Sequence, residues 1–210
     1  MVAANAEPSF TSGVILAAGS ARRMGQLKQL LPVAGKPMVQ HVIDAAEQSR
    51  LDEIVLVLGH RADEIRQAVV LPAAARIVVN EHHATGQGGS LATGLRGCDE
   101  RAGAAAILLG DQPGVTAALI DRVVAAFADQ NTDARPILRP VYGAGHGSGE
   151  RTPGHPVILA RAVWEAAMNI EGDSGARSLI ADDPLRVLEL PLDGPPPADI
   201  DTPEAYRRHT

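Results

Sequence analysis

The stretch Gly13-Val-Ile-Leu-Ala-Ala-Gly19 is followed at once by Ser-Ala-Arg-Arg-Met-Gly-Gln-Leu-Lys28. Its first part is a short apolar run that ends in glycine, which is typical of a strand buried on both faces of a sheet. Its second part is a loop of mostly small residues that carries Arg22, Arg23 and Lys28. Small residues let a ligand approach the backbone closely, and exposed N–H groups favour anions. The stretch therefore predicts a strand followed by a phosphate-binding loop, with a solvated basic loop as the alternative.

Strands and helices are expected to alternate along the rest of the chain. The expected strands lie at 13–19, 53–59, 75–80, 104–110, 136–141, 156–159 and 186–190. The expected helices lie at 37–49, 62–70, 90–97, 116–129, 161–169, 174–181 and 202–208, with Thr116 as an N-cap. Repeated βαβ units predict an α/β fold with a mostly parallel sheet and helices on both faces. In such sheets ligands bind beyond the carboxyl ends of the strands, so the residues that follow each strand are the candidates for function.

Composition excludes several classes of protein. The net charge of −6, with one Trp, two Tyr and two Phe, argues against nucleic-acid binding. A single cysteine excludes an internal disulfide and a zinc site built from several cysteines. No apolar stretch reaches the roughly 18–20 residues of a membrane span, and residues 1–12 lack the pattern of a secretory signal. We therefore expect a cytoplasmic protein without a membrane partner, whose residues 1–12 form a disordered lead-in.

The two common nucleotide-binding signatures are absent from the chain. Gly-x-x-x-x-Gly-Lys-Ser/Thr does not occur, so the first loop is not a P-loop. Gly-x-Gly-x-x-Gly does not occur either, which weakens the interpretation as a dinucleotide-dependent oxidoreductase.

Leu-Ala-Ala-Gly-x-x-x-Arg-Met-Gly-x-x-Lys, placed after the first strand, resembles the signature of the nucleotidyltransferases related to molybdenum cofactor biosynthesis, the MobA-like NTP transferase family. The branch it resembles most is that of the CTP:molybdopterin cytidylyltransferases. Further matches in the family's order are Gly-His-Arg at 59–61, Asn80, Gly-Gln-Gly-Gly-Ser-Leu at 86–91, Leu-Gly-Asp-Gln-Pro at 109–113, Gly-His-Pro at 154–156, Gly-Asp-Ser-Gly-Ala-Arg at 172–177 and Asp-Ile-Asp-Thr-Pro at 199–203. The resemblance implies one Rossmann-like, three-layer α/β/α nucleotidyltransferase domain of the GT-A-like type over residues 13–210.

The resemblance also implies an activity. Family members transfer a nucleoside monophosphate from an NTP to a phosphate and release pyrophosphate. The expected reaction here is transfer of CMP from CTP to molybdopterin, with Mg²⁺ as cofactor. Members that use cytidine tend to carry Leu-Ala-Ala-Gly in the first loop, and Ala18 stands in that register. A client molybdoenzyme or its chaperone is implied as a further partner.

The resemblance assigns roles residue by residue. Arg23, Lys28 and Asp111 are the expected catalytic residues. Asp111 and Asp201 are the expected metal ligands. The expected nucleotide-binding residues are Leu16, Ala17, Ala18, Gly19, Arg22, Arg23, Lys28, Asn80, Gly88 and Ser90. The expected acceptor-binding residues are His155, Asp173 and Arg177.

The residues by themselves leave alternatives open. Asp111 could cap the helix that follows it or form a turn, and Asp201 could cap the last helix. Asp199 and Asp201 point the same way on an extended strand, so either could bind the metal. Ser90 could be a plain helix cap, and a lone histidine such as His155 is more often structural.

Other functions also remain open at this point. Transfer of a nucleotide to another small phosphorylated acceptor is the first alternative, and a redox or cofactor-binding member of the same family is the second. A chaperone that binds nucleotide without catalysis is the third.

Overall fold

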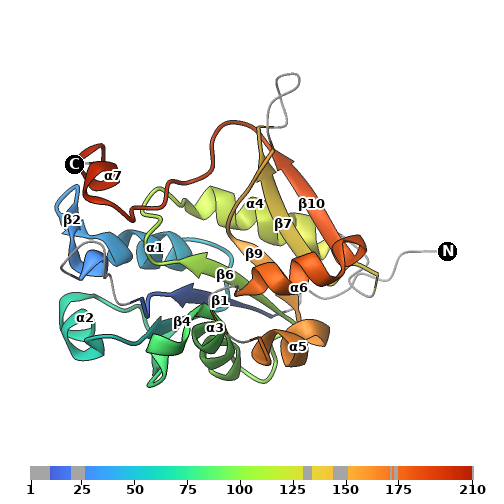
Figure 1. Cartoon of the computed structure of the whole chain (residues 1–210), viewed down its shortest axis with the longest axis horizontal. Helices are drawn as coiled ribbons and strands as arrows, with labels where there is room; N and C mark the ends of the chain where they lie inside the picture. Colours follow the sequence, from blue (N-terminus) through green and yellow to red (C-terminus); the bar gives the residue numbers. More distant parts are fainter. Residues whose placement is uncertain are drawn as a thin grey trace.

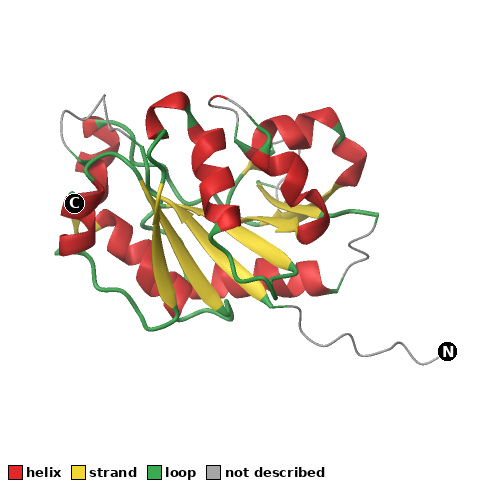
Figure 2. Ribbon diagram, turned by 90° about the horizontal axis from the view of Figure 1, so that it is seen from below, coloured by secondary structure: helices red, strands yellow, loops and turns green. Residues whose placement is uncertain are grey.

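A mostly parallel sheet runs through the molecule, and helices cover both of its faces (Figures 1 and 2). The structure, a computed structural model, describes residues 10–19, 27–129, 134–143, 151–170, 172 and 175–209. The predicted site residues Arg22, Arg23 and Asp173 lie outside the described residues.

In the described part of the chain the main sheet has the strand order β10-β7-β9-β6-β1-β4-β5, with β8 added at β7. Its strands are β1 (Thr11–Leu16), β4 (Glu53–Leu58), β5 (Ala75–Val79), β6 (Ala104–Leu109), β7 (Ile137–Tyr142), β8 (Thr152–Pro153), β9 (Val157–Ala160) and β10 (Val187–Leu192). β9 runs antiparallel to both β6 and β7, whereas β10, β7, β6, β1, β4 and β5 share one direction. A separate hairpin pairs β2 (Pro32–Val33) with β3 (Lys36–Pro37). The predicted α/β class with a mostly parallel sheet is confirmed.

The helices form the two outer layers. They are α1 (Met38–Glu47), α2 (Ala62–Ala68), α3 (Gln87–Arg96), α4 (Ala117–Ala128), α5 (Trp164–Met168), α6 (Ala176–Asp182) and α7 (Pro203–Arg207). Short 3₁₀ helices are η1 (Lys28–Leu30), η2 (His83–Thr85), η3 (Arg161–Val163) and η5 (Pro184–Arg186). α1 and α4 pack on one face of the sheet, and α3 and α5 lie together on the other. The Thr116 hydroxyl accepts a hydrogen bond from the N–H of Leu119, so Thr116 caps α4 as predicted.

The first strand begins earlier than expected. β1 starts at Thr11 instead of at residue 13, so residues 11 and 12 belong to the sheet and are not part of a disordered lead-in. The reason is a set of polar contacts that the apolar pattern does not show. The Thr11 N–H donates to the Asp52 carboxylate at 2.8 Å, and the Ser12 hydroxyl donates to Glu53 at 2.6 Å.

Helix α3 also begins earlier than expected, at Gln87 instead of at Ser90. The turn predicted at residues 86–90 is therefore mostly the first turn of a helix, and Gly86 is its N-cap. Glycines usually weaken a helix, but here they permit close packing against its neighbours. A Cβ at Gly94 would lie 2.4 Å from a methyl carbon of Val14, and one at Gly88 would lie 2.3 Å from the carbonyl oxygen of Ile170.

The carboxyl ends of the parallel strands meet at one edge of the sheet, and the C-terminal segment crosses this edge. After β10 the chain runs back as a coil to α7, which lies beside β2 (Figure 1). The Ile200 N–H donates to the carbonyl oxygen of Asp111 at 3.0 Å, and the Tyr206 hydroxyl donates to that of Pro32 at 2.7 Å. The Ile200 side chain is fully buried beside Leu31 and Met38. Residues late in the chain are thereby held next to the loop after β1.

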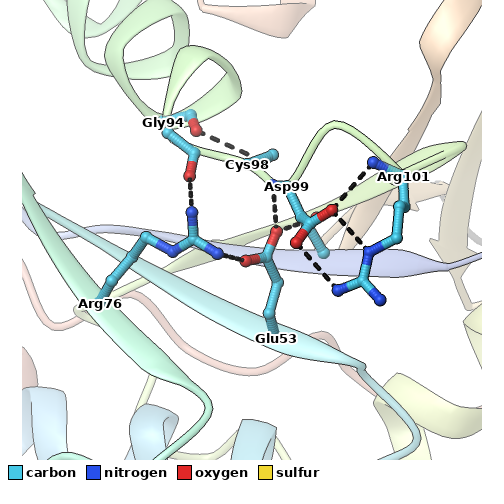
Figure 3. A network of polar contacts seen from close by, with 8 residues as sticks. Glu53, Arg76, Gly94, Cys98, Asp99 and Arg101 are labelled. Carbon is cyan, nitrogen blue, oxygen red and sulfur yellow. Dashed lines mark hydrogen bonds and ion pairs between the residues drawn. The ribbon is translucent and has the colours of Figure 1, made fainter.

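A polar network lies at the opposite, amino edge of the sheet (Figure 3). The Glu53 carboxylate is buried there and pairs with Arg76. It also accepts hydrogen bonds from the Ser12 hydroxyl and from the N–H of Asp99, each at 2.6 Å. The Cys98 thiol donates to the Gly94 carbonyl oxygen, and burial raises the pKa of this thiol to about 11. Cys98 packs against the core, and its raised pKa disfavours the thiolate at neutral pH. The network anchors three strands and α3.

Replacing Glu53 with alanine is expected to lower the free energy of unfolding by about 3 kcal/mol, because it leaves buried donors unpaired and Arg76 without its partner. Urea unfolding checks this. Glu64→Ala is the matched control, since the ion pair of Glu64 with Arg61 is half exposed and its loss is expected to cost less than about 1 kcal/mol. Equal losses in the two variants would contradict the anchoring role of Glu53.

Candidate active site

The ammonium group of Lys28 lies between two carboxylates. Its Nζ is 2.5 Å from Oδ2 of Asp111 and 2.5 Å from Oδ1 of Asp201. The Lys28 and Asp111 side chains are only 14% and 19% exposed, whereas that of Asp201 is 47% exposed. Three residues that are far apart in the sequence, all of them predicted site residues, therefore meet at one point.

Each of the three side chains reaches this point from a different segment at the carboxyl edge. Lys28 begins η1, which follows the loop after β1. Asp111 follows β6 by two residues, and Asp201 belongs to the coil that leads into α7. The hydrogen bond from the Ile200 N–H to the Asp111 carbonyl oxygen holds the last two segments together.

The charge balance of the cluster favours a cation between the carboxylates. Burial by itself would lower the pKa of Lys28, but the charge and hydrogen bond of Asp111, followed by those of Asp201, outweigh it. The pKa of Lys28 is consequently raised above 10.5, and the group stays protonated at neutral pH. The protein's own ammonium thus occupies the position between the two acids.

The capping alternatives for the two acids do not hold. Thr116 caps α4, and the Thr202 hydroxyl caps α7 by accepting a hydrogen bond from the N–H of Ala205 at 3.1 Å. The carboxylates of Asp111 and Asp201 are therefore not needed as caps and face Lys28 instead.

Asp199 lies near the cluster but has a different partner. Its carboxylate accepts a hydrogen bond from the Gln112 side-chain amide at 2.8 Å. Partial burial, together with the charges of Asp111 and Asp201, raises the pKa of Asp199. Of the two candidates left open by the sequence, it is Asp201 that shares a cation with Asp111.

The first loop lies beside this cluster. Ala17 and Ala18 are buried and Gly19 is exposed, while Leu16 ends β1 and accepts a hydrogen bond from the Gly110 N–H at 3.0 Å. The predicted triphosphate contacts of Arg22 and Arg23 fall in the part of the loop that is not described.

The predicted base or ribose contacts form a second group at the end of β5. The Asn80 side-chain amide donates to the Ser90 hydroxyl at 3.0 Å, and its oxygen accepts from the N–H of His82 at 3.0 Å. Asn80 and Ser90 are both buried, and Ser90 lies inside α3 instead of capping it. Gly88 is buried in the first turn of the same helix against Ile170. The three residues thus lie together but apart from the Lys28 contacts.

His155 lies at the same edge as the acids because β9 runs antiparallel, so the residues that precede β9 meet the end of β6. Its Nδ1–H donates to the Ile107 carbonyl oxygen at 3.2 Å. Burial lowers the pKa of His155, and the charges of Asp199, Asp111 and Arg177 also act on the ring. The neutral ring is therefore favoured. Arg177 itself is exposed on α6.

Two buried glutamines near the cluster were missed by the sequence reasoning. Gln29 donates from its side-chain amide to the carbonyl oxygens of Ala17 and Gly19, and Gln112 holds Asp199. Only their position in the sequence could have pointed to them, because each directly follows an expected catalytic residue, Lys28 or Asp111.

Residues 13–187 match the MobA-like NTP transferase domain. The chain belongs to the MobA-like NTP transferase family. The family resemblance inferred from the motifs is confirmed.

Solved structures of similar proteins share the fold of this MobA-like chain over nearly its whole length. The Rv0371c protein of Mycobacterium tuberculosis has a TM-score of 0.81 and 31% identity, over 97% of this chain and 98% of that one. A complex of the same protein with manganese has a TM-score of 0.76 and 31% identity, over 94% and 96% of the two chains. A nucleotidyl transferase from Methanothermobacter, at a TM-score of 0.75 and 22% identity over 95% of each chain, shares the fold.

The curated relatives of this MobA-like chain are longer proteins. Bifunctional protein GlmU of Trichlorobacter lovleyi is 35% identical over 122 residues, which are 57% of this chain and 26% of that protein. The chain spans about a quarter of the length of the curated relatives that it matches. No helix in the described part is long and apolar enough to cross a membrane.

The acids of this MobA-like domain suit a hard divalent cation. Magnesium prefers one or two carboxylates together with phosphate oxygens and water, and two carboxylates already share a cation here. Among the described residues no group of three or more His, Cys, Asp or Glu side chains is placed to hold a metal. The arrangement therefore fits a metal bound jointly by Asp111, Asp201 and a phosphate ligand better than a complete protein cage.

Proposed function

We propose that this chain transfers CMP from CTP to the phosphate of molybdopterin or molybdenum cofactor, with Mg²⁺, and releases pyrophosphate. The observation that carries the proposal is the sharing of the Lys28 ammonium by Asp111 and Asp201 beside the loop after β1. Phosphate transfer needs a cation near the triphosphate and carboxylates for a divalent ion, and this cluster offers both. We further propose that the reaction takes place in the cytoplasm and that a molybdoenzyme or its chaperone receives the product.

In the proposed reaction an oxygen of the acceptor phosphate attacks the α-phosphorus of CTP. The bond from that phosphorus to the oxygen bridging to the β-phosphate breaks, and pyrophosphate leaves with the electron pair. The attacking oxygen is already an anion, so no general base is required. Catalysis then depends on positioning and on cations that offset the repulsion between anions.

The chain's own residues divide this work. Lys28 and Arg23, with Arg22 beside them, bind the triphosphate and stabilise the leaving group. Asp111 and Asp201 hold the divalent ion, which supplies neutralisation of charge at the phosphates when bound.

Substrate selection is assigned to the surrounding groups. The backbone of residues 16–19 and the Asn80, Gly88 and Ser90 group are proposed for the base and ribose, and the Leu-Ala-Ala-Gly register that includes Ala18 favours cytosine. His155, Asp173 and Arg177 are proposed for the acceptor. Burial lowers the pKa of His155, which favours the neutral ring.

CTP with Mg²⁺ is expected to raise the melting temperature more than GTP or NADH does, because a ligand that binds only the native state stabilises it by mass action. At a concentration about 100 times the dissociation constant, this stabilisation is about 2.7 kcal/mol. Differential scanning fluorimetry with the three ligands at equal concentration measures it. Equal shifts with all three would remove the case for CTP.

The transfer itself is tested by release of pyrophosphate from CTP on addition of purified molybdopterin cofactor, with GTP as the control nucleotide. Release only with a different small phosphorylated acceptor, such as methylerythritol phosphate, would support the proposed cytidylyl transfer but contradict the proposed acceptor. An absence of release with every acceptor would overturn the proposal in favour of a protein that binds nucleotide without catalysis.

A further inference from the structure

Gln29 is a buried polar residue whose hydrogen bonds lead to the first loop. Its side chain is 2% exposed, yet it lies in a 3₁₀ helix directly after Lys28. Its Nε2 donates to the carbonyl oxygen of Ala17 at 3.1 Å and to that of Gly19 at 3.0 Å. One side chain therefore clamps two carbonyl groups of the loop that precedes it.

The other carbonyl groups of this loop also face the protein. The Leu16 carbonyl oxygen accepts from the Gly110 N–H at 3.0 Å. The Ala18 carbonyl oxygen packs against Gly59, where an added Cβ would lie only 2.8 Å from it. With the two carbonyls held by Gln29, all four carbonyl oxygens of residues 16–19 point into the fold.

The Ala17 N–H donates to the Val57 carbonyl oxygen at 2.9 Å, but the next two N–H groups of this loop are left for other partners. Among the described residues, no hydrogen bond uses the N–H of Ala18 or Gly19. A carbonyl dipole aimed at an anion repels it, whereas a free N–H group attracts it. Removing the carbonyls from the exposed side of the loop gives that side the polarity that a triphosphate requires.

We infer that Gln29 is a positioning residue that sets the polarity of the nucleotide-binding loop. It does so by holding the Ala17 and Gly19 carbonyl oxygens away from the ligand. The inference rests on the proposed binding of a nucleotide and adds a specific residue to it. Because Gln29 is adjacent to Lys28 in the chain, it also ties the loop to the cation that would contact the same phosphates.

The hydrogen bonds of Gln29 do not give the folded protein the greatest stability that this position allows. Its Oε1 is buried and has no hydrogen-bond partner among the described residues. A buried acceptor without a partner lowers the stability of the fold. Replacing Gln29 with an apolar side chain of the same size would lose two hydrogen bonds, but it would also remove this unpaired acceptor and so offset part of the loss. Its benefit is therefore expected in ligand binding more than in folding.

Gln40 provides a matched control on α1. It is 8% exposed, and its Nε2 donates to Asp44 at 2.7 Å and to the Val70 carbonyl oxygen at 3.0 Å. Its Oε1 accepts from the Val70 N–H at 2.8 Å, so both ends of this amide are paired. None of these hydrogen bonds reaches the first loop or the Lys28 cluster.

The experiment compares Gln29→Met with Gln40→Met, because methionine keeps the length of glutamine and removes its hydrogen bonds. We expect Gln40→Met to lower the melting temperature more than Gln29→Met does, since only Gln40 loses bonds at both ends. We expect the dissociation constant for CTP with Mg²⁺, measured by calorimetry, to rise about tenfold or more in Gln29→Met and to stay unchanged in Gln40→Met. The KM for CTP should rise in parallel, with a smaller change in kcat.

Wild-type protein gives a second measurement that does not depend on the folding of a variant. Addition of CTP with Mg²⁺ is expected to slow hydrogen exchange in the peptide that contains Ala18 and Gly19. An unchanged exchange rate there, or equal CTP affinity in Gln29→Met and wild type, would overturn the inference while nucleotide binding stands. A wild-type protein that binds neither CTP nor GTP would instead overturn the proposed function.

Discussion

Replacing Asp111 with asparagine is expected to lower the rate of nucleotidyl transfer by about 10³-fold or more while the fold remains intact. Asparagine has the size of aspartate, and its side-chain oxygen can still accept the hydrogen bond from Lys28. It lacks the negative charge that a divalent ion requires. The loss should therefore appear in turnover, measured as pyrophosphate release, and not in the melting temperature.

Asp199→Asn is the matched control for this prediction. Asp199 is an acid at the same edge of the sheet, but its carboxylate pairs with Gln112 and not with Lys28. We expect this variant to keep activity within a few-fold of wild type and Asp201→Asn to lose most of it. An active Asp111→Asn enzyme would refute the metal role of Asp111. An inactive Asp199→Asn with an active Asp201→Asn would exchange the roles of the two later acids.

The sequence predicts the sheet, and the edge at which the candidate site residues meet, because both depend on short-range patterns. Apolar runs such as β4 and β6 are buried almost completely, as expected of central parallel strands. Since parallel strands end at one edge, the position of Asp111 just after β6 is enough to place it there. Its partners Lys28 and Asp201 were chosen by family resemblance, and the structure brings all three together.

What the sequence could not predict depends on contacts between distant segments. That Asp201 and not Asp199 pairs with Lys28 depends on the hydrogen bond of Ile200 to Asp111 and on Gln112, which no local pattern encodes. The hydrogen bonds of Gln29 to the first loop cannot be predicted from the sequence either, because a glutamine between Lys28 and an apolar residue is typical of a surface segment.

The misplaced boundaries have the same physical origin. α3 begins at Gln87 because its glycines allow it to pack tightly, although glycine by itself predicts a turn. β1 begins at Thr11 because Asp52 and Glu53 hold the polar residues at its start. In both places tertiary contacts outweigh the local preference of the residues.

Replacing Lys28 with methionine is expected to change the binding of nucleotide and of metal in opposite directions. Lys28 is proposed to contact the triphosphate, so its loss should weaken CTP binding by about 1.5–3 kcal/mol, the value of a charged hydrogen bond. In the structure, however, the ammonium lies between Asp111 and Asp201, where the two acids would hold a divalent ion. Without it two carboxylates face each other unneutralised, so manganese or magnesium should bind this variant more tightly than it binds wild type.

Titration of the nucleotide-free protein with Mn²⁺, followed by electron paramagnetic resonance, measures the metal affinity, and calorimetry measures that for CTP. Lys36→Met is the control, because Lys36 forms an exposed ion pair with Asp44, which is not an acid of the cluster. It should leave both affinities unchanged. A Lys28→Met variant that binds Mn²⁺ no better than wild type would show that the ammonium does not compete for the metal position. An unchanged CTP affinity in Lys28→Met would show that Lys28 only neutralises the two acids, because removal of a cation that contacts phosphate must weaken binding.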